Sequence, residues 1–200
     1  MTATRILVLI AAVAALGFYV GPYRDKEQDE ERLAKIAGVI AGRDVGIACP
    51  GTLATLTEVS AHDGSVAFTP DGRPTDEAEL SSRTCSRLRA FLSGEIAGLD
   101  CLASGATCSK AVEDAAVAVN VLSHEAWHLA GERNESVAQC YALQSNEDTA
   151  IRLGATPAEA RAIADFVVRR VHPVLPPEYK TTECRDDGPL DLEPARTGWP

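Results

Sequence analysis

His124, Glu125 and His128 are the residues best suited to do chemistry, because together they form an H-E-x-x-H pattern. Four residues make a little over one helical turn, so on a helix the two imidazoles lie on one face, one above the other. Two imidazoles placed in this way can bind one Zn²⁺ ion, and the glutamate between them can accept a proton from a water molecule on the metal. The pattern therefore predicts that His124 and His128 are zinc ligands and that Glu125 is a general base. The competing interpretation is that both histidines are ordinary core or surface residues.

A catalytic zinc ion needs a third protein ligand and an open position for water. Glu132 and Glu135 both follow closely after Gly131, which is expected to end the helix of the two histidines. Glu135 would stand in the first turn of the next helix, just after the cap residue Asn134, where its side chain can point back toward the histidines. An acidic residue at a helix start is also favoured by the helix dipole alone. We expect Glu135 to be the third ligand and keep Glu132 as the alternative.

The surrounding segment resembles the zincin metallopeptidases. One zincin class, the metzincins, continues as H-E-x-x-H-x-x-G-x-x-H and has a Met-turn below the metal. Here Asn134 replaces the last histidine and Met1 is the only methionine, so that class is excluded. The gluzincins instead take a glutamate ligand from the following helix, and residues 135–142 look like their E-x-x-A-x-x-x-A ligand helix. The resemblance covers residues 119–144, and it departs from many gluzincins in how soon Glu135 follows the histidines.

The resemblance to gluzincins implies a minimal zincin-like domain that hydrolyses peptide bonds in a peptide or protein substrate. Zinc would be its cofactor, and Glu125 would take a proton from the water that attacks the scissile carbonyl. Such enzymes usually add a histidine or a tyrosine that stabilises the oxyanion. The sequence does not choose among four candidates for this role, which are His62, Tyr141, His172 and Tyr179.

The elements that must position these residues begin with short strands. Strands are predicted over residues 45–49, 55–61 and 65–68. Asp63-Gly64, which precedes the last of them, is a strong hairpin signal, and residues 71–74 are expected to form a turn. Together these strands predict one small sheet.

Cap residues mark out four helices after the strands. The predicted helices begin at the caps Thr75 or Asp76, Ser109, Asn134 and Thr156, and they end near Gly94, Ala130, Leu153 and His172. Gly131 and Gly154 are expected to stop the second and third helices, and Pro157 with Glu159 completes the start of the fourth. A few strands followed by helices define an α+β fold, whose core is the H-E-x-x-H helix and the ligand helix.

The six cysteines contain no C-x-x-C pair, so a separate zinc knuckle is not expected. Disulfides formed in an oxidising compartment explain them better. The sequence alone does not select one pairing. Cys101 and Cys108 flank a small loop and are the best local pair. The set would be completed by Cys49 with Cys85 and by Cys140 with Cys184, the last of which would fasten the C-terminal tail to the ligand helix.

The chain has 200 residues and a formal net charge of −10. This length suits one domain of ordinary size, or one smaller domain with an anchor, and we assign residues 43–172 to the zincin-like domain. Residues 25–42 have the pattern of a charged helix and are expected to form a stalk before it. The excess of acidic residues and the lack of a basic stripe argue against nucleic acid as a partner.

The uncharged run over residues 6–23 is long enough to cross a bilayer as a helix. We expect residues 1–24 to be an uncleaved membrane anchor, and a cleaved signal peptide that yields a secreted form is the alternative. Because all six cysteines follow this segment, the catalytic domain is expected on the extracytoplasmic side. Residues 173–200 are rich in proline and are expected to form an extended tail packed on the domain.

The sequence as a whole thus predicts a membrane-anchored, extracytoplasmic zinc metallopeptidase. One alternative is a catalytically inactive zincin-like scaffold or binding module that is stapled by disulfides. Another is a disulfide-stapled domain that binds no metal. Metal content separates the last reading from the other two, and Glu125-dependent cleavage separates an enzyme from a scaffold.

Overall fold

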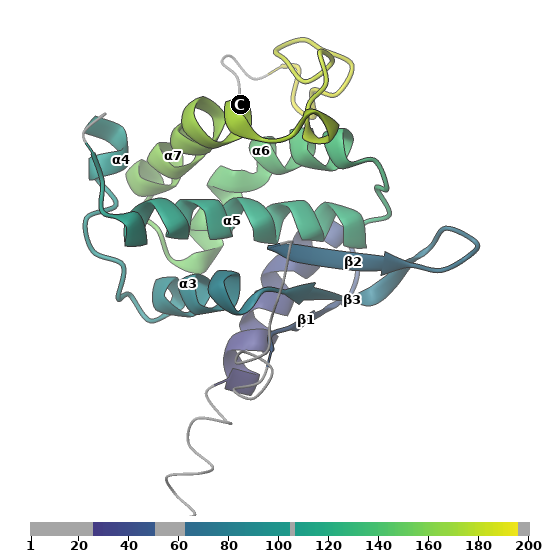
Figure 1. Ribbon diagram of the computed structural model, residues 1–200, viewed down its shortest axis with the longest axis horizontal. Helices are drawn as coiled ribbons and strands as arrows, with labels where there is room; N and C mark the ends of the chain where they lie inside the picture. Colours follow the sequence, from purple (N-terminus) through teal and green to yellow (C-terminus); the bar gives the residue numbers. More distant parts are fainter. Residues whose placement is uncertain (1–25, 51–62, 105–106, 196–200) are drawn as a thin grey trace, which may run out of the picture.

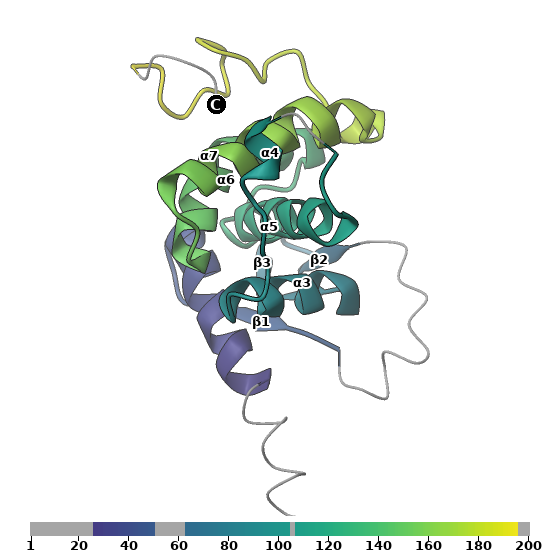
Figure 2. The ribbon, with the colours of Figure 1, turned by 90° about the vertical axis from the view of Figure 1, so that its left-hand side faces the viewer.

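The computed structural model describes residues 26–50, 63–104 and 107–195. It has an α+β architecture built around a central helix, α5 (Lys110–Leu129) (Figure 1). A small mixed sheet lies on one side of α5, and two further helices, α6 (Glu135–Leu153) and α7 (Pro157–Phe166), lie on the other (Figures 1 and 2). The predicted fold class is therefore confirmed at this level.

The sheet has three strands in the order β1-β3-β2. The central strand β3 (Pro74–Leu80) pairs in parallel with β1 (Gly46–Ala48) and in antiparallel fashion with β2 (Gly64–Phe68). Because β3 lies in the middle, β2 is an edge strand among the described strands, and both β2 and β3 pack against α5 (Figure 1). Strands were predicted at the positions of β1 and β2, and both are confirmed.

The strand β3 corrects one prediction, because a helix was expected to begin at Thr75 or Asp76. In β3 the side chains of Ala78 and Leu80 are buried, and the glutamates on either side of Ala78 are exposed. This alternation, together with pairing on both edges, favours a strand over the local helical preference. The helix begins later, as α3 (Ser82–Leu92), with Ser81 as its cap.

The hairpin that joins β2 to β3 turns at the predicted position. Gly72 adopts a positive φ of 84°, and its amide donates to the carbonyl of Thr69 at 2.8 Å. Only glycine adopts this backbone region without steric cost. The strand predicted over residues 55–61 and the hairpin before Gly64 depend on residues 51–62, which lie outside the described residues.

The starts of the next three helices, and the ends of α5 and α6, lie where the sequence predicted them, whereas α7 ends at Phe166 and not near His172. Ser109 caps α5, and Asn134 caps α6 by accepting from two backbone amides. Gly131 follows α5 with a positive φ of 109°, and Gly154 follows α6 with a positive φ of 113°. The start of α7 has a complete capping box, formed by Thr156 and Glu159. The chain then continues through a π-helical turn (Val167–Val171) and two 3₁₀ turns (His172–Val174 and Pro177–Tyr179).

A helix over residues 26–41 lies beside β1 and contributes to the hydrophobic core (Figures 1 and 2). Its residues Leu33, Ile36 and Ala37 are buried there. The carboxylate of Glu30 accepts a hydrogen bond of 2.8 Å from the backbone amide of Cys49, just after β1. These contacts fix the helix against the sheet, so the segment expected as a stalk packs on the domain along this face.

Three disulfides join all six cysteines, and they are the pairs proposed from the sequence. Cys49–Cys85 links the end of β1 to α3. Cys101–Cys108 closes the loop before α5, which also contains the short helix α4 (Cys101–Ser104) that was not predicted. Cys140–Cys184 attaches the C-terminal segment to α6. No helix within the described residues combines the length and apolar character that a membrane span needs, and the predicted anchor over residues 1–24 lies outside them.

Candidate metal centre

His124 and His128 lie on one face of α5, as their spacing predicts. Their ring centroids are 4.6 Å apart, and their two Nε2 atoms are 2.9 Å apart. Both side chains are buried. The Nε2 atoms therefore point toward a common position between them.

Glu135 completes this arrangement from the first turn of α6. Its Oε2 atom lies 3.0 Å from Nε2 of His124 and 3.3 Å from Nε2 of His128. The tight turn between Gly131 and Asn134 makes this approach possible, because it brings the start of α6 back onto the end of α5. His124, His128 and Glu135 form a group whose ligand atoms all lie within 4.8 Å of one another.

Glu132, the alternative to Glu135, has a different place in the turn. Its Oε1 atom accepts a hydrogen bond of 2.8 Å from the backbone amide of Asn134. Its backbone carbonyl accepts a hydrogen bond of 2.7 Å from Nδ1 of His128, since a carbonyl can only accept. This bond fixes the ring and leaves Nε2 of His128 free to bind a metal, a common arrangement for metal-ligating histidines. Nothing in the sequence pattern pointed to this carbonyl.

Gln139, which lies one turn further along α6, interacts with the other histidine, His124. Its side chain is only 1% exposed, and it exchanges hydrogen bonds with Asn120 of α5. It also interacts with the His124 imidazole in a way that favours the protonated ring, although Nδ1 of this buried ring lacks a hydrogen bond of normal geometry. Sequence reasoning missed Gln139, which occupies the position one helical turn after Glu135.

The charge states of His124 and Glu135 suit metal binding. Burial lowers the pKa of His124, partly opposed by its hydrogen bond to Glu135. The same hydrogen bond lowers the pKa of Glu135, against a smaller opposing effect of burial. The neutral imidazole and the ionised carboxylate are the forms that coordinate a metal ion.

Glu125 is buried beside this group, with 4% of its surface exposed. Burial raises its pKa to about 8, and the nearby charge of Glu135 adds to the shift. Its Oε2 atom has no hydrogen-bond partner in the described part of the chain. Such a carboxyl can hold a proton near neutral pH, as a general base must do after it has accepted one.

Gly64, at the start of β2, packs directly against Glu125. A Cβ atom at this glycine would lie 2.7 Å from Oε1 of Glu125. Only a residue without a side chain lets the strand pass so close to the carboxyl group. In the sequence, Asp63-Gly64 indicated only a turn, so this role of Gly64 was not predicted.

The variant Gly64→Ala is expected to be less stable by about 1–3 kcal/mol, a typical cost of overpacking. Urea denaturation of the wild-type and variant proteins measures this difference. In a Glu125→Ala background the carboxyl group that the new methyl group would meet is gone, so Gly64→Ala should then cost little. An equal cost in both backgrounds would show that the strand and Glu125 do not make this contact.

Of the three oxyanion candidates within the described residues, Tyr179 is the one with a ring contact to a histidine of the pair. Its ring centroid is 5.6 Å from that of His124. Tyr141 instead packs on Trp127, with ring centroids 4.8 Å apart. His172 lies in a 3₁₀ turn, where burial and the charge of Lys180 lower its pKa. The fourth candidate, His62, lies outside the described residues.

The environment of Tyr179 connects it electrostatically to the site. Burial raises its pKa, and the charges of Glu135 and Glu125 raise it further. On the other side, the ring of Phe68 at the end of β2 meets His128 edge-on, with centroids 6.1 Å apart. Phe68 and Tyr179 therefore border the histidine pair from β2 and from the C-terminal segment.

No protein-family model, no curated protein and no solved structure matches this chain. The site must therefore be interpreted from its own geometry. That geometry consists of two imidazole nitrogens and one carboxylate oxygen from two helices, with a second, buried carboxyl group beside them.

Proposed function

We propose that this protein is a zinc-dependent metallopeptidase of the zincin type. The observation that supports this most is the convergence of Nε2 of His124, Nε2 of His128 and Oε2 of Glu135. Catalytic zinc sites combine three such protein ligands with one open position. Glu125 lies beside the group on the same helix, in the position of a general base.

The distances between the three donor atoms are compatible with a zinc ion. With metal–ligand distances of about 2.0–2.1 Å in a tetrahedral site, two donor atoms are roughly 3.3 Å apart. The separations here are 2.9, 3.0 and 3.3 Å. Small side-chain adjustments would therefore be enough for these residues to hold the ion.

Bound zinc would supply a Lewis acid for the attacking water molecule and the scissile carbonyl. Glu125 would accept a proton from that water and later donate it to the leaving amine. Its burial, which raises its pKa in the metal-free protein, favours holding this proton between the two steps. Tyr179 would donate a hydrogen bond to the carbonyl oxygen as negative charge develops on it.

An extended peptide is a substrate that fits this surface. Among the described strands, β2 pairs on one side only, and Gly64 of this strand contacts Glu125. A peptide that added to the free edge of β2 would gain backbone hydrogen bonds, the recognition mode known as β-augmentation. Its backbone would then run past Glu125 and the histidine pair.

We also propose that the domain is anchored to a membrane and faces an oxidising, extracytoplasmic compartment. Three disulfides that use every cysteine support an oxidising compartment. The uncharged run over residues 6–23 supports the anchor. A mature amino terminus between residues 15 and 24 in the native protein would instead indicate the secreted form.

Zinc analysis of the full chain, purified without a His tag, tests the metal site. We expect near-stoichiometric zinc that is lost in the double variant His124→Ala, His128→Ala. Glu135→Ala should weaken zinc binding by roughly 10–100-fold or more, because even lost outer partners have effects of that size. The matched control is Glu132→Ala, which keeps the backbone carbonyl that orients His128 and should bind zinc almost normally.

Each of the other outcomes changes the proposal in a defined way. If Glu132→Ala weakens zinc binding and Glu135→Ala does not, the third ligand is Glu132. If neither variant has an effect, the site is not of the gluzincin type. If the wild-type protein binds no zinc, the disulfide-stapled domain without metal is the better description. Stoichiometric zinc without cleavage of any peptide in a library would favour the inactive scaffold.

A further inference from the structure

The C-terminal segment over residues 175–192, here called the clamp segment, reaches the metal centre without being part of the hydrophobic core. None of its side chains is buried, and its only regular structure is one 3₁₀ turn, Pro177–Tyr179. A segment of this kind gains little free energy from apolar burial. Other interactions must therefore hold it in place.

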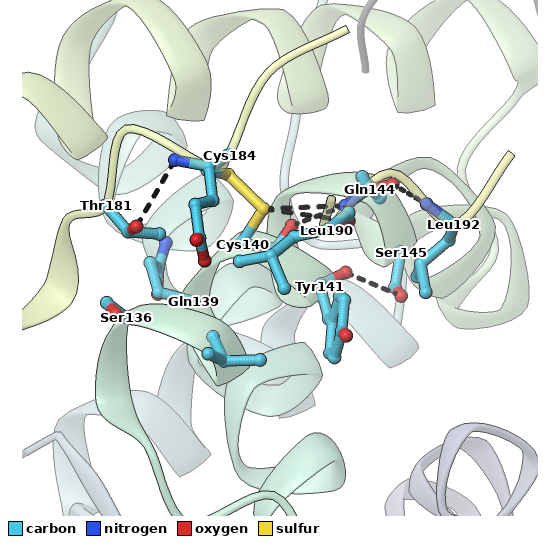
Figure 3. The surroundings of a disulfide bond; sticks show 12 residues. Ser136, Gln139, Cys140, Tyr141, Gln144, Ser145, Thr181, Cys184, Leu190 and Leu192 are labelled. Atoms are coloured by element: carbon cyan, nitrogen blue, oxygen red, sulfur yellow. Dashed lines mark hydrogen bonds between the residues drawn. A yellow bond between two sulfur atoms is a disulfide. The ribbon is translucent and has the colours of Figure 1, made fainter. Parts of the chain in front are cut away.

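Two attachments to α6 hold the clamp segment, and Figure 3 shows both. The first is the disulfide between Cys140 and Cys184. The second is the side-chain amide of Gln144, which donates to the carbonyl of Leu190 at 2.9 Å and accepts from the amide of Leu192 at 2.7 Å. Gln144 thus fixes two backbone groups of the clamp segment at once.

Both attachments come from the helix that also carries Glu135. Cys140 and Gln144 lie one helical turn apart on α6, and Cys140 is fully buried. The position of the clamp segment is therefore defined relative to the helix that supplies a candidate metal ligand. Any shift of the segment along α6 would be a shift relative to the metal centre.

Tyr179 lies midway between two fixed points of the chain. The 3₁₀ turn that ends at Val174 is five residues before it, and Cys184 is five residues after it. Lys180 adds a hydrogen bond of 2.7 Å to the carbonyl of Pro173. With both ends fixed, the loop between them places the Tyr179 ring 5.6 Å from the His124 ring.

We infer that Cys140, Cys184 and Gln144 are positioning residues that hold Tyr179 against His124 and so complete one wall of the metal site. The catalytic part of this inference rests on the proposed function, whereas the structural part does not. In the structural part, the two attachments replace the apolar burial that the clamp segment lacks. In the catalytic part, they hold the Tyr179 ring beside His124, close enough to the site for its hydroxyl to donate a hydrogen bond to a substrate carbonyl.

The attachments are needed because ordering a chain segment has an entropic cost. Fixing the backbone of one residue costs about 1–2 kcal/mol, so an exposed segment without attachments is expected to leave its place. Without the disulfide, the loop that carries Tyr179 would keep the Lys180 hydrogen bond, the hydrogen bonds of Gln144 and the packing of its 3₁₀ turn on α6. Tyr179 would then sample many positions, most of them away from His124.

Nuclear Overhauser effects between the Tyr179 and His124 rings test the structural part in the metal-free, full-length protein. The wild-type protein is expected to show them, because the ring centroids are 5.6 Å apart. They should weaken in Gln144→Ala and disappear in the double variant Cys140→Ser, Cys184→Ser. Gln144 is only partly buried, so its variant keeps the test valid if the double variant does not fold.

The matched control is the double variant Cys101→Ser, Cys108→Ser, which removes a disulfide from the loop before α5. It should keep the ring contacts of Tyr179. If the contacts persist in Gln144→Ala and in the variant without Cys140 and Cys184, the clamp inference is wrong, whether or not the protein binds zinc. Absence of the contacts in the wild-type protein would also overturn it.

Kinetics with the zinc-loaded protein test the catalytic part. Tyr179→Phe is expected to lower kcat by roughly 10²–10³-fold, as the loss of one oxyanion donor does. The variant without Cys140 and Cys184 should lower kcat in the same direction and keep its zinc. Adding Tyr179→Phe to that variant should then cost much less than it does in the wild type, because the hydroxyl is already misplaced. Fully additive losses would show that the clamp segment does not act through Tyr179.

Discussion

Replacement of Glu125 by glutamine is expected to lower kcat/KM for peptide cleavage by roughly 10²–10⁴-fold, the usual contribution of a general base or acid. Glutamine has nearly the same shape as glutamate, but it cannot take a proton from water. Because Glu125 is not among the three residues that converge on the candidate metal position, the variant should still bind zinc. Cleavage rates measured beside zinc content therefore separate a loss of chemistry from a loss of metal.

The matched control for this prediction is Glu132→Gln. Glu132 follows α5 in the same turn region, but its side chain bonds to the amide of Asn134 rather than facing the histidine pair. Its variant should keep both zinc and turnover. Undiminished cleavage by zinc-loaded Glu125→Gln would rule out Glu125 as the base, and a loss of zinc in that variant would point to a structural role instead.

The position of the three candidate ligands could be predicted because the signals that determine it are local. The spacing of His124 and His128 follows from helix geometry once the segment is helical. The glycine after α5 and the asparagine cap of α6 fix the turn that brings Glu135 back. All of these signals lie within a short stretch of sequence, so no long-range contact had to be known.

The strand β3 could not be predicted in the same way. Thr75 and Asp76 are good helix caps, and several residues after them favour helices. The strand forms because β1 and β2 pair with both of its edges, and these partners are distant in sequence. Tertiary pairing of this kind routinely overrides local propensity.

The roles of Tyr179 and Gly64 at the site could not be predicted from local sequence either. Four side chains had the right chemistry to stabilise an oxyanion, and only the fold places one of them beside His124. Its place depends on a disulfide between residues 44 positions apart in the sequence. The contact of Gly64 with Glu125 likewise joins a strand to a helix that is remote in sequence.

The metal-free protein is expected to lose stability as the pH rises from about 4.5 to about 8, because folding raises the pKa of Glu125 from 4.5 to about 8. A folded-state pKa above the unfolded value means that the folded protein binds the proton more tightly. The stabilisation is therefore complete below pH 4.5 and is lost as the pH rises through 8. At about 1.4 kcal/mol per pKa unit, this shift corresponds to a loss of roughly 5 kcal/mol in the free energy of unfolding.

Urea denaturation in the presence of EDTA at several pH values measures this effect as the difference between the wild-type protein and Glu125→Gln. The glutamine variant cannot titrate at this position, so it should become more stable than the wild type as the pH increases. Glu135→Gln is expected to show the opposite pH dependence of stability relative to the wild type. The hydrogen bond to His124 lowers the pKa of Glu135, so the stabilising effect of Glu135 is lost only as the pH falls through 4.5 and below. Parallel pH profiles of Glu125→Gln and the wild type would show that Glu125 is not desolvated in the folded protein. The basis for its role as a proton acceptor that works near neutral pH would then be removed.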